Sequence, residues 1–136
     1  MIRLKNRNEF LVFAGKAGAA ATGAYFTLKL PFACDLAAID GKVRVAGTTG
    51  TQTTDIQKNG TSIFSGAGKL DFASGATAAT YGARTADPTA FVKGDILTFN
   101  ITAIHTTPAT DTAVSVTLRR SVSQPKAVST ITDAVE

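Results

Sequence analysis

Cysteine, histidine, tryptophan and charged residues are all scarce in this chain of 136 residues. Its one cysteine, Cys34, excludes an intramolecular disulfide, and the nearby Phe32 and Leu36 predict that the thiol is a small buried hydrophobe. The one histidine, His105, has no nucleophile at a recognisable spacing, so we expect a solvated or hydrogen-bonded loop residue rather than a general base. Charged residues make up 18% of the chain, below the usual share of about 25%. This composition suits a protein packed against neighbours, and it equally suits a threonine-rich β-protein.

The sequence also lacks the patterns that bind cofactors, metals or nucleic acids. It has no His/Cys pair for zinc, no phosphate-binding loop and no dinucleotide fingerprint, so no catalytic, cofactor-binding or metal-binding residues are predicted. The aspartates lie near predicted turns, where Asp commonly caps its own backbone, although a calcium site stays open. The net charge is +4, but the basic residues are scattered without interleaved aromatics, which argues against a nucleic-acid partner. No apolar run approaches the length of a membrane span, so no membrane partner is predicted.

The two ends of the chain differ from its middle. The apolar run from Phe10 to Gly15 is too short for a cleaved secretion signal, and the tract from Gly15 to Gly23 has no period and no bulky side chain. We therefore predict an N-terminal arm over residues 1–23, a folded β-sandwich body over residues 24–120 and a C-terminal tail over residues 121–136.

The strongest local signal is Asn59-Gly60, which lies between two strand-like runs and predicts a hairpin. A type I′ turn needs positive φ at both central residues, which Gly adopts freely and Asn tolerates. The two-residue loop places Ile56 beside Ile63 on one face. In a regular hairpin Phe64 would lie on the opposite face and would need a cover, either from the N-terminal arm or from another subunit. A bulge that returns Phe64 to the core is the alternative.

Alternation of apolar and polar residues predicts further strands. The clearest of them places Leu97, Phe99, Ile101 and Ala103 on one face. Asp40-Gly41 predicts another turn. The predicted strands cover Tyr25 to Leu30, Lys42 to Ala46, Lys69 to Ala73, Ile96 to Ile104 and Thr112 to Arg120.

About seven or eight short strands without helical periodicity predict an all-β fold. We expect a single antiparallel β-sandwich, jelly-roll-like, with extended N- and C-terminal arms. An up-and-down barrel is the alternative. The sandwich is favoured because Tyr25–Leu30 and Ile96–Ile104, far apart in the sequence, must pair or face each other. The long polar connection from Ser74 to Pro88 is expected to carry an edge strand, a contact or a site.

The segments TTDIQKNGTSIF, KLDF, FVKGDILTFNITAI and VSVTLRR follow one another in this order. Together they resemble a recurrent small β-module of tailed-phage virion proteins, in which a D-x-x-x-N-G-x-x-I/L-F hairpin precedes a G-D-x-L strand and a closing V-x-V-x-L strand. The resemblance covers the chain from Tyr25 to Arg120, and its motifs are structural rather than catalytic. It implies a jelly-roll-like sandwich, often trimeric, found as a capsid decoration or head-fibre base, or within tail-fibre and baseplate proteins.

The resemblance implies a non-enzymatic virion protein, made in the host cytoplasm, that binds the capsid exterior as a homotrimer and contacts the major capsid protein. A carbohydrate-binding or receptor-binding module of the tail fibre or baseplate is the alternative, but two tyrosines and no tryptophan are a poor supply of sugar-stacking rings. An enzyme such as a small jelly-roll isomerase ranks third, because it would need clustered histidines. The predicted partner contacts are Arg3, Lys5, Arg7, Phe10, Val12, Phe64 and Val122.

Overall fold

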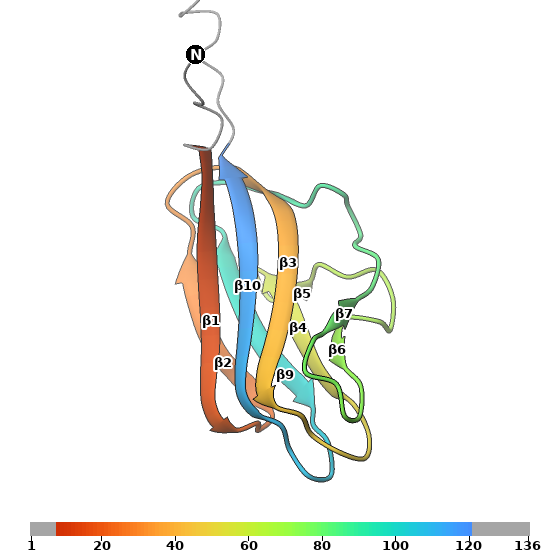
Figure 1. Ribbon diagram of the computed structural model, residues 1–136. Helices are drawn as coiled ribbons and strands as arrows, with labels where there is room; N and C mark the ends of the chain where they lie inside the picture. Colours follow the sequence, from red (N-terminus) through yellow and green to blue (C-terminus); the bar gives the residue numbers. More distant parts are fainter. Residues whose placement is uncertain (1–7, 121–136) are drawn as a thin grey trace, which may run out of the picture.

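The computed structural model describes residues 8–120 as two antiparallel β-sheets packed face to face (Figure 1). No α-helix occurs among these residues. The strands are β1 (Glu9–Ala19), β2 (Gly23–Lys29), β3 (Cys34–Val45), β4 (Gln52–Lys58), β5 (Thr61–Ser62), β6 (Leu70–Phe72), β7 (Thr80–Tyr81), β8 (Ala90–Phe91), β9 (Ile96–Ala103) and β10 (Thr110–Arg120).

The strands are distributed between the sheets in the jelly-roll pattern. One sheet has the order β1-β10-β3-β8 and the other β2-β9-β4-β6-β7, with β5 paired to β4. The chain changes sheet at every step from β1 to β4 and again from β8 to β10, so that β1 and β2 lie on the same side of the sandwich (Figure 1). The predicted all-β sandwich is confirmed. The pairing of β2 with β9 joins the two segments that were expected to meet.

The hairpin after β4 forms as its turn residues predict. Asn59 and Gly60 both have positive φ, 53° and 85°. The Ile63 N–H donates to the Ile56 carbonyl at 3.0 Å, which confirms the predicted register. The Asn59 amide Nδ2 also donates to the Asp95 carboxylate at 2.9 Å, so the turn is tied to the residue that precedes β9.

Asp95 holds the loop before β9 in place. Its carboxylate accepts hydrogen bonds from the Val92 N–H at 2.8 Å and from Asn59 Nδ2 at 2.9 Å. The Leu30 N–H donates to the Asp95 carbonyl at 2.9 Å, which links this loop to the end of β2. The hydrogen bond from Val92, followed by that from Asn59, lowers the pKa of Asp95 because both favour the charged carboxylate.

The core lies between the sheets and is centred on β9. Leu97, Phe99 and Ile101 are 1%, 0% and 1% exposed, which confirms the predicted inward face. The Phe99 ring centroid lies 5.8 Å from that of Phe26 on β2. Burial of each such side chain contributes about 1.5–3 kcal/mol. Ala103, predicted on the same face, is exposed where β9 ends.

The prediction of an N-terminal arm over residues 1–23 is wrong for Glu9–Ala19, because these residues form β1. This strand pairs with β10 from Glu9, opposite Arg119, to Ala19, opposite Thr110. Ala14 is fully buried in the same cluster as Phe99, so large neighbours fill the space that small side chains leave. Residues 1–7 of the predicted arm and residues 121–136, the predicted tail, lie outside the described residues.

Asp40 and Gly41 lie inside β3 and not in the predicted turn. A Cβ at Gly41 would stand 3.1 Å from carbon atoms of Leu70, Phe72 and Ala79. The position therefore requires glycine because the facing sheet approaches closely, and not because the chain reverses.

Two further features concern the position of Tyr25 and the connection from Ser74 to Pro88. In a regular strand Tyr25 would lie on the face opposite Phe26 and Leu28, but a register shift between Ala24 and Phe26 turns it toward the core. The Tyr25 ring centroid lies 6.4 Å from that of Phe99, and burial raises the pKa of the Tyr25 hydroxyl. The long connection from Ser74 to Pro88 contains β7, which is the edge strand expected there.

Candidate interaction surface

Strand β1 presents two large apolar side chains to solvent. Leu11 and Phe13 are 50% and 65% exposed, and they alternate with inward-facing residues of the same strand. Opposite them on β10 lie Thr117 and Ser115. Opposite residues of an antiparallel pair share a face, so the two apolar side chains stand at the edge of a face that continues with small polar residues.

The side formed by β1 and β2 is the long open edge of the sandwich. β1 has 11 residues and β2 has 7, whereas β7 and β8, which end the two sheets on the other side, have 2 each. Proteins protect exposed edges with short strands, charges, proline or bulges. β1 carries only Glu9 and Lys16 as charges and no proline, and its one register shift against β10 lies between Lys16 and Ala19. Within residues 8–120 its backbone pairs with β10 alone. Its other edge is open to pairing with another chain.

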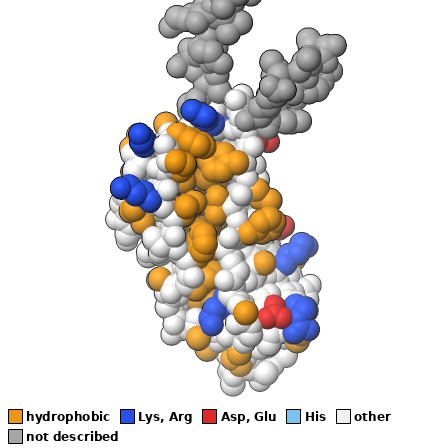
Figure 2. Space-filling model, turned by 90° about the vertical axis from the view of Figure 1, so that its left-hand side faces the viewer, with side chains coloured by type: hydrophobic (Ala, Val, Ile, Leu, Met, Phe, Trp, Pro, Cys, Tyr) orange, Lys and Arg blue, Asp and Glu red, His pale blue; other side chains and the backbone are white. Residues whose placement is uncertain are grey.

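Apolar side chains continue from β1 around this side of the molecule. Figure 2 shows them gathered most densely at the end where β1 begins. There the rings of Phe10 and Phe32 pack edge to face with centroids 5.0 Å apart, and the Arg120 guanidinium lies 4.4 Å from the Phe32 centroid. Farther along, Phe26 and Leu28 of β2 are partly buried against the core. We call Leu11, Phe13 and the open edge of β1 the β1 surface.

Ion pairs mark both ends of the β1 surface. Arg119 Nη2 lies 2.8 Å from the Glu9 carboxylate at one end, and Arg44 Nε lies 2.5 Å from the Asp111 carboxylate at the other. Asp111 also accepts a hydrogen bond from the Gly18 N–H at 2.7 Å. The hydrogen bond from Gly18, followed by that from Arg44, lowers the pKa of Asp111. Between these pairs Lys16 is the one charged residue of β1.

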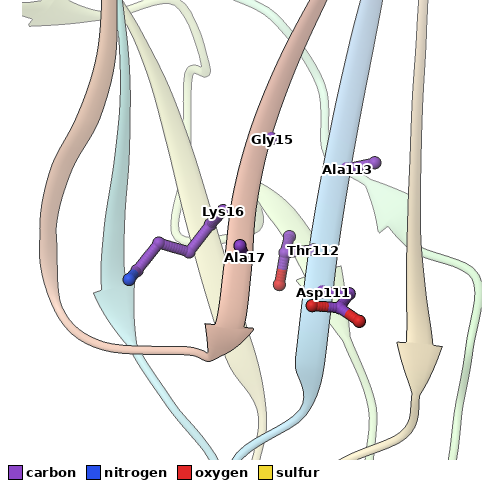
Figure 3. A pocket seen from close by; sticks show the side chains of 6 residues that line it. All are labelled: Gly15, Lys16, Ala17, Asp111, Thr112 and Ala113. Atoms are coloured by element: carbon purple, nitrogen blue, oxygen red, sulfur yellow. The ribbon is translucent and has the colours of Figure 1, made fainter.

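A hollow follows Phe13 along the seam between β1 and β10 (Figure 3). Gly15 and Ala113 lie opposite each other there, and a Cβ at Gly15 would meet no atom within 4 Å. The space measures about 440 Å³. Small residues on both strands thus leave room for an apolar side chain from outside. The hollow is lined by Gly15, Lys16, Ala17, Asp111, Thr112 and Ala113.

The structure corrects part of the predicted contact set. Val12 and Phe64 are only 8% and 5% exposed, so their prediction as surface contacts is wrong. Phe64 returns to the core because β5 ends at Ser62 and Phe64 then bridges to Arg84. Phe10 is half-buried beside Phe32. Arg3, Lys5, Arg7 and Val122 lie outside the described residues.

Leu11 and Phe13 were missed by the sequence prediction. The signal was present, because the run from Phe10 to Ala14 is apolar at every position. In a strand, successive side chains point to opposite faces, so such a run is apolar on both. One face of β1 packs against the core, and the other face exposes Leu11 and Phe13.

Groups able to do chemistry are buried in other parts of the body. His105 is 1% exposed, and its Nε2 lies 3.3 Å from the Ala73 carbonyl, so it is a hydrogen-bonded loop residue but not a solvated one. A Cβ at Gly47 would collide with the His105 ring. Cys34 is buried as predicted, and burial raises the pKa of its thiol. In residues 8–120 there is no group of three or more His, Cys, Asp or Glu able to hold a metal ion. The same range holds no helix long and apolar enough to cross a membrane.

Comparison with known proteins yields no family model, no curated protein and no solved structure that matches this chain. The fold and the β1 surface define a class: a jelly-roll sandwich with one open apolar edge.

Proposed function

We propose that the chain is a non-enzymatic structural protein of a phage virion, a capsid decoration protein whose β1 surface binds protein on the outer capsid. The observation that carries the proposal is the open edge of β1 with Leu11 and Phe13 exposed on it. An unpaired strand edge and exposed apolar side chains favour burial against another protein. Three copies, as the resemblance implies, remain a prediction.

Two further observations support this proposal. The hairpin motif of the phage-module resemblance forms the predicted turn at Asn59-Gly60. The jelly-roll topology is used by viral capsid and lectin domains, among others. Fold alone does not fix a function, so the β1 surface decides between these uses. Its aliphatic Leu11 beside Phe13 suits a protein partner better than a sugar ring, which stacks on flat aromatics.

The binding free energy of a single β1 contact suits a protein that attaches to a repeating lattice at several points. Burial of one Leu or Phe side chain contributes about 1.5–3 kcal/mol, so a single β1 contact is weak after the entropy of association is subtracted. Weak contacts become strong when linked bodies bind several lattice sites at once, because the second contact is then intramolecular. A decoration protein can therefore hold a capsid through small surfaces.

The test is the occupancy of capsid sites. Particles assembled without the protein are mixed with the wild type and with Phe13→Asp, and bound protein is counted by quantitative gel and electron microscopy. We expect the wild type on the capsid lattice and a lower occupancy for Phe13→Asp. The matched control is Tyr81→Asp, which places the same charge at a residue 57% exposed on β7 and should bind as the wild type does. Binding at the tail tip would replace the proposal with a receptor-binding role.

A further inference from the structure

The β1 surface carries a projection and a hollow side by side. Leu11 and Phe13 project outward, and the hollow begins at Gly15, the next outward-facing position of the same strand. Alternate residues of a strand share a face, so the projection and the hollow lie along one line. Ala17, where the register shift of β1 begins, also lines the hollow. A surface with both parts is complementary to itself.

We infer that the β1 surface binds a second copy of this chain, with the open edges of the two β1 strands paired antiparallel about a twofold axis beside Ala14. In this register Phe13 of one copy lies opposite Gly15 of the other, and Leu11 comes opposite the register shift that follows Lys16. A rotation of 180° about this axis exchanges the two copies, so the projection of each copy fills the hollow of the other and the contact is closed. Packing of an aromatic ring over a cross-strand glycine stabilises paired strands.

The charges and edges of the sheet agree with this pairing. In the same register Lys16 lies opposite Val12, and Glu9 comes opposite the segment beyond the register shift of β1, which carries no charge, so no like charges of β1 meet. Each copy contributes a sheet that runs from β1 to β8, and the joined sheet ends in β8 on both sides. Because β8 has 2 residues, no long edge of this sheet remains open. The pairing therefore stops at two copies and does not extend into a filament.

This inference rests on the proposed function and deepens it by naming the protein that the β1 surface binds on the capsid, which is the neighbouring copy of this chain. Phe13→Asp then lowers occupancy because the bodies are no longer linked. The inference predicts a twofold contact in place of the threefold arrangement that the resemblance implies. It is tested without any capsid, so its outcome is separate from that of the occupancy experiment. If the protein pairs in solution but does not bind particles, the pairing stands and the virion role fails. If it binds particles but has the mass of one copy in solution, the virion role stands and the pairing fails.

The first experiment measures the mass of the purified full chain by light scattering and sedimentation at micromolar concentration. We expect two copies for the wild type and for Tyr81→Asp, and one folded copy for Phe13→Asp. Because Phe13 is 65% exposed, its replacement should leave the fold intact. Hot-spot residues of this kind weaken association by at least about 30-fold when removed. A wild-type mass of one copy, or of three, would overturn the inference.

The hollow and the strand edge are each tested by a separate measurement. Gly15→Leu fills the hollow from within and should weaken pairing at least about tenfold, since the partner's Phe13 is excluded. Hydrogen exchange then reports the edge itself. The amides of β1 that point away from β10 should exchange slowly in the wild type and quickly in Phe13→Asp. The amides of β9 should exchange at the same rate in both proteins. Equal exchange of β1 in the two proteins would show that the edges do not pair.

Discussion

Replacing Gly41 with alanine should destabilise the protein, although the same replacement in the middle of a strand usually raises stability. A glycine in a strand interior costs about 0.5–1 kcal/mol relative to alanine, which favours the variant. At Gly41, however, the new Cβ would lie 3.1 Å from carbons of Leu70, Phe72 and Ala79, inside the optimal contact distance of about 3.5–4.0 Å. Overpacking a well-filled core costs about 1–3 kcal/mol. The difference between this cost and the gain is a net loss of up to about 2.5 kcal/mol in the free energy of unfolding.

The assay is urea denaturation followed by circular dichroism at one fixed protein concentration, because any self-association makes stability depend on concentration. The matched control is Gly66→Ala, where an added Cβ meets nothing within 4 Å and φ is not positive. This control should be neutral or gain up to about 1 kcal/mol. Gly41→Val, with two more carbons, should lose more than Gly41→Ala. If Gly41→Ala is as stable as Gly66→Ala or more so, the close approach of the sheets at β3 is refuted.

Three further predictions concern the core, the pH dependence and β1. Phe99→Ala should lower the free energy of unfolding by about 3–5 kcal/mol in urea denaturation, and an unchanged midpoint would contradict its central place in the core. Because the hydrogen bond from Val92 lowers the folded-state pKa of Asp95, the ionised carboxylate stabilises the fold above its unfolded pKa of about 3.9, and this stabilisation is lost as pH falls through the folded pKa. The deficit of Asp95→Asn should therefore shrink between pH 7 and pH 3, and a constant deficit would exclude this effect. Deletion of residues 1–7 should leave the β-sheet circular dichroism unchanged. Deletion of residues 1–22 removes β1 and should abolish cooperative unfolding. If both truncated proteins melt at the same temperature, β1 is not part of the core.

The parts of the fold that depend on local chemistry could be predicted from the sequence. Asn59-Gly60 fixes its turn through the φ values that these two residues allow, and Phe99 follows from strict alternation. Glycine was harder to interpret, because it serves both turns and close approaches of backbone. Asp40-Gly41 suggested a turn, but the reason for Gly41 lies on the facing sheet, which the local sequence does not reveal.

The candidate surface was predicted in the right segment but with the wrong side chains. Phe10 and Val12 were assigned to a free arm, whereas β1 is part of the sheet and turns Val12 into the core. The small residues after Ala14 hid the strand, because inward positions usually hold bulkier side chains. The burial of Phe64 depends on where β5 ends. The end of β5 is linked to a long-range contact, the bridge between Phe64 and Arg84.

The most direct test of the central claim is a density map of the intact particle that contains this protein. The claim is that the β1 surface is the contact through which the jelly-roll body joins other protein. We predict density for the body on the outer capsid, with Leu11 and Phe13 buried against another chain. A map in which the body is bound through its β7 and β8 side while the edge of β1 faces solvent would contradict the claim.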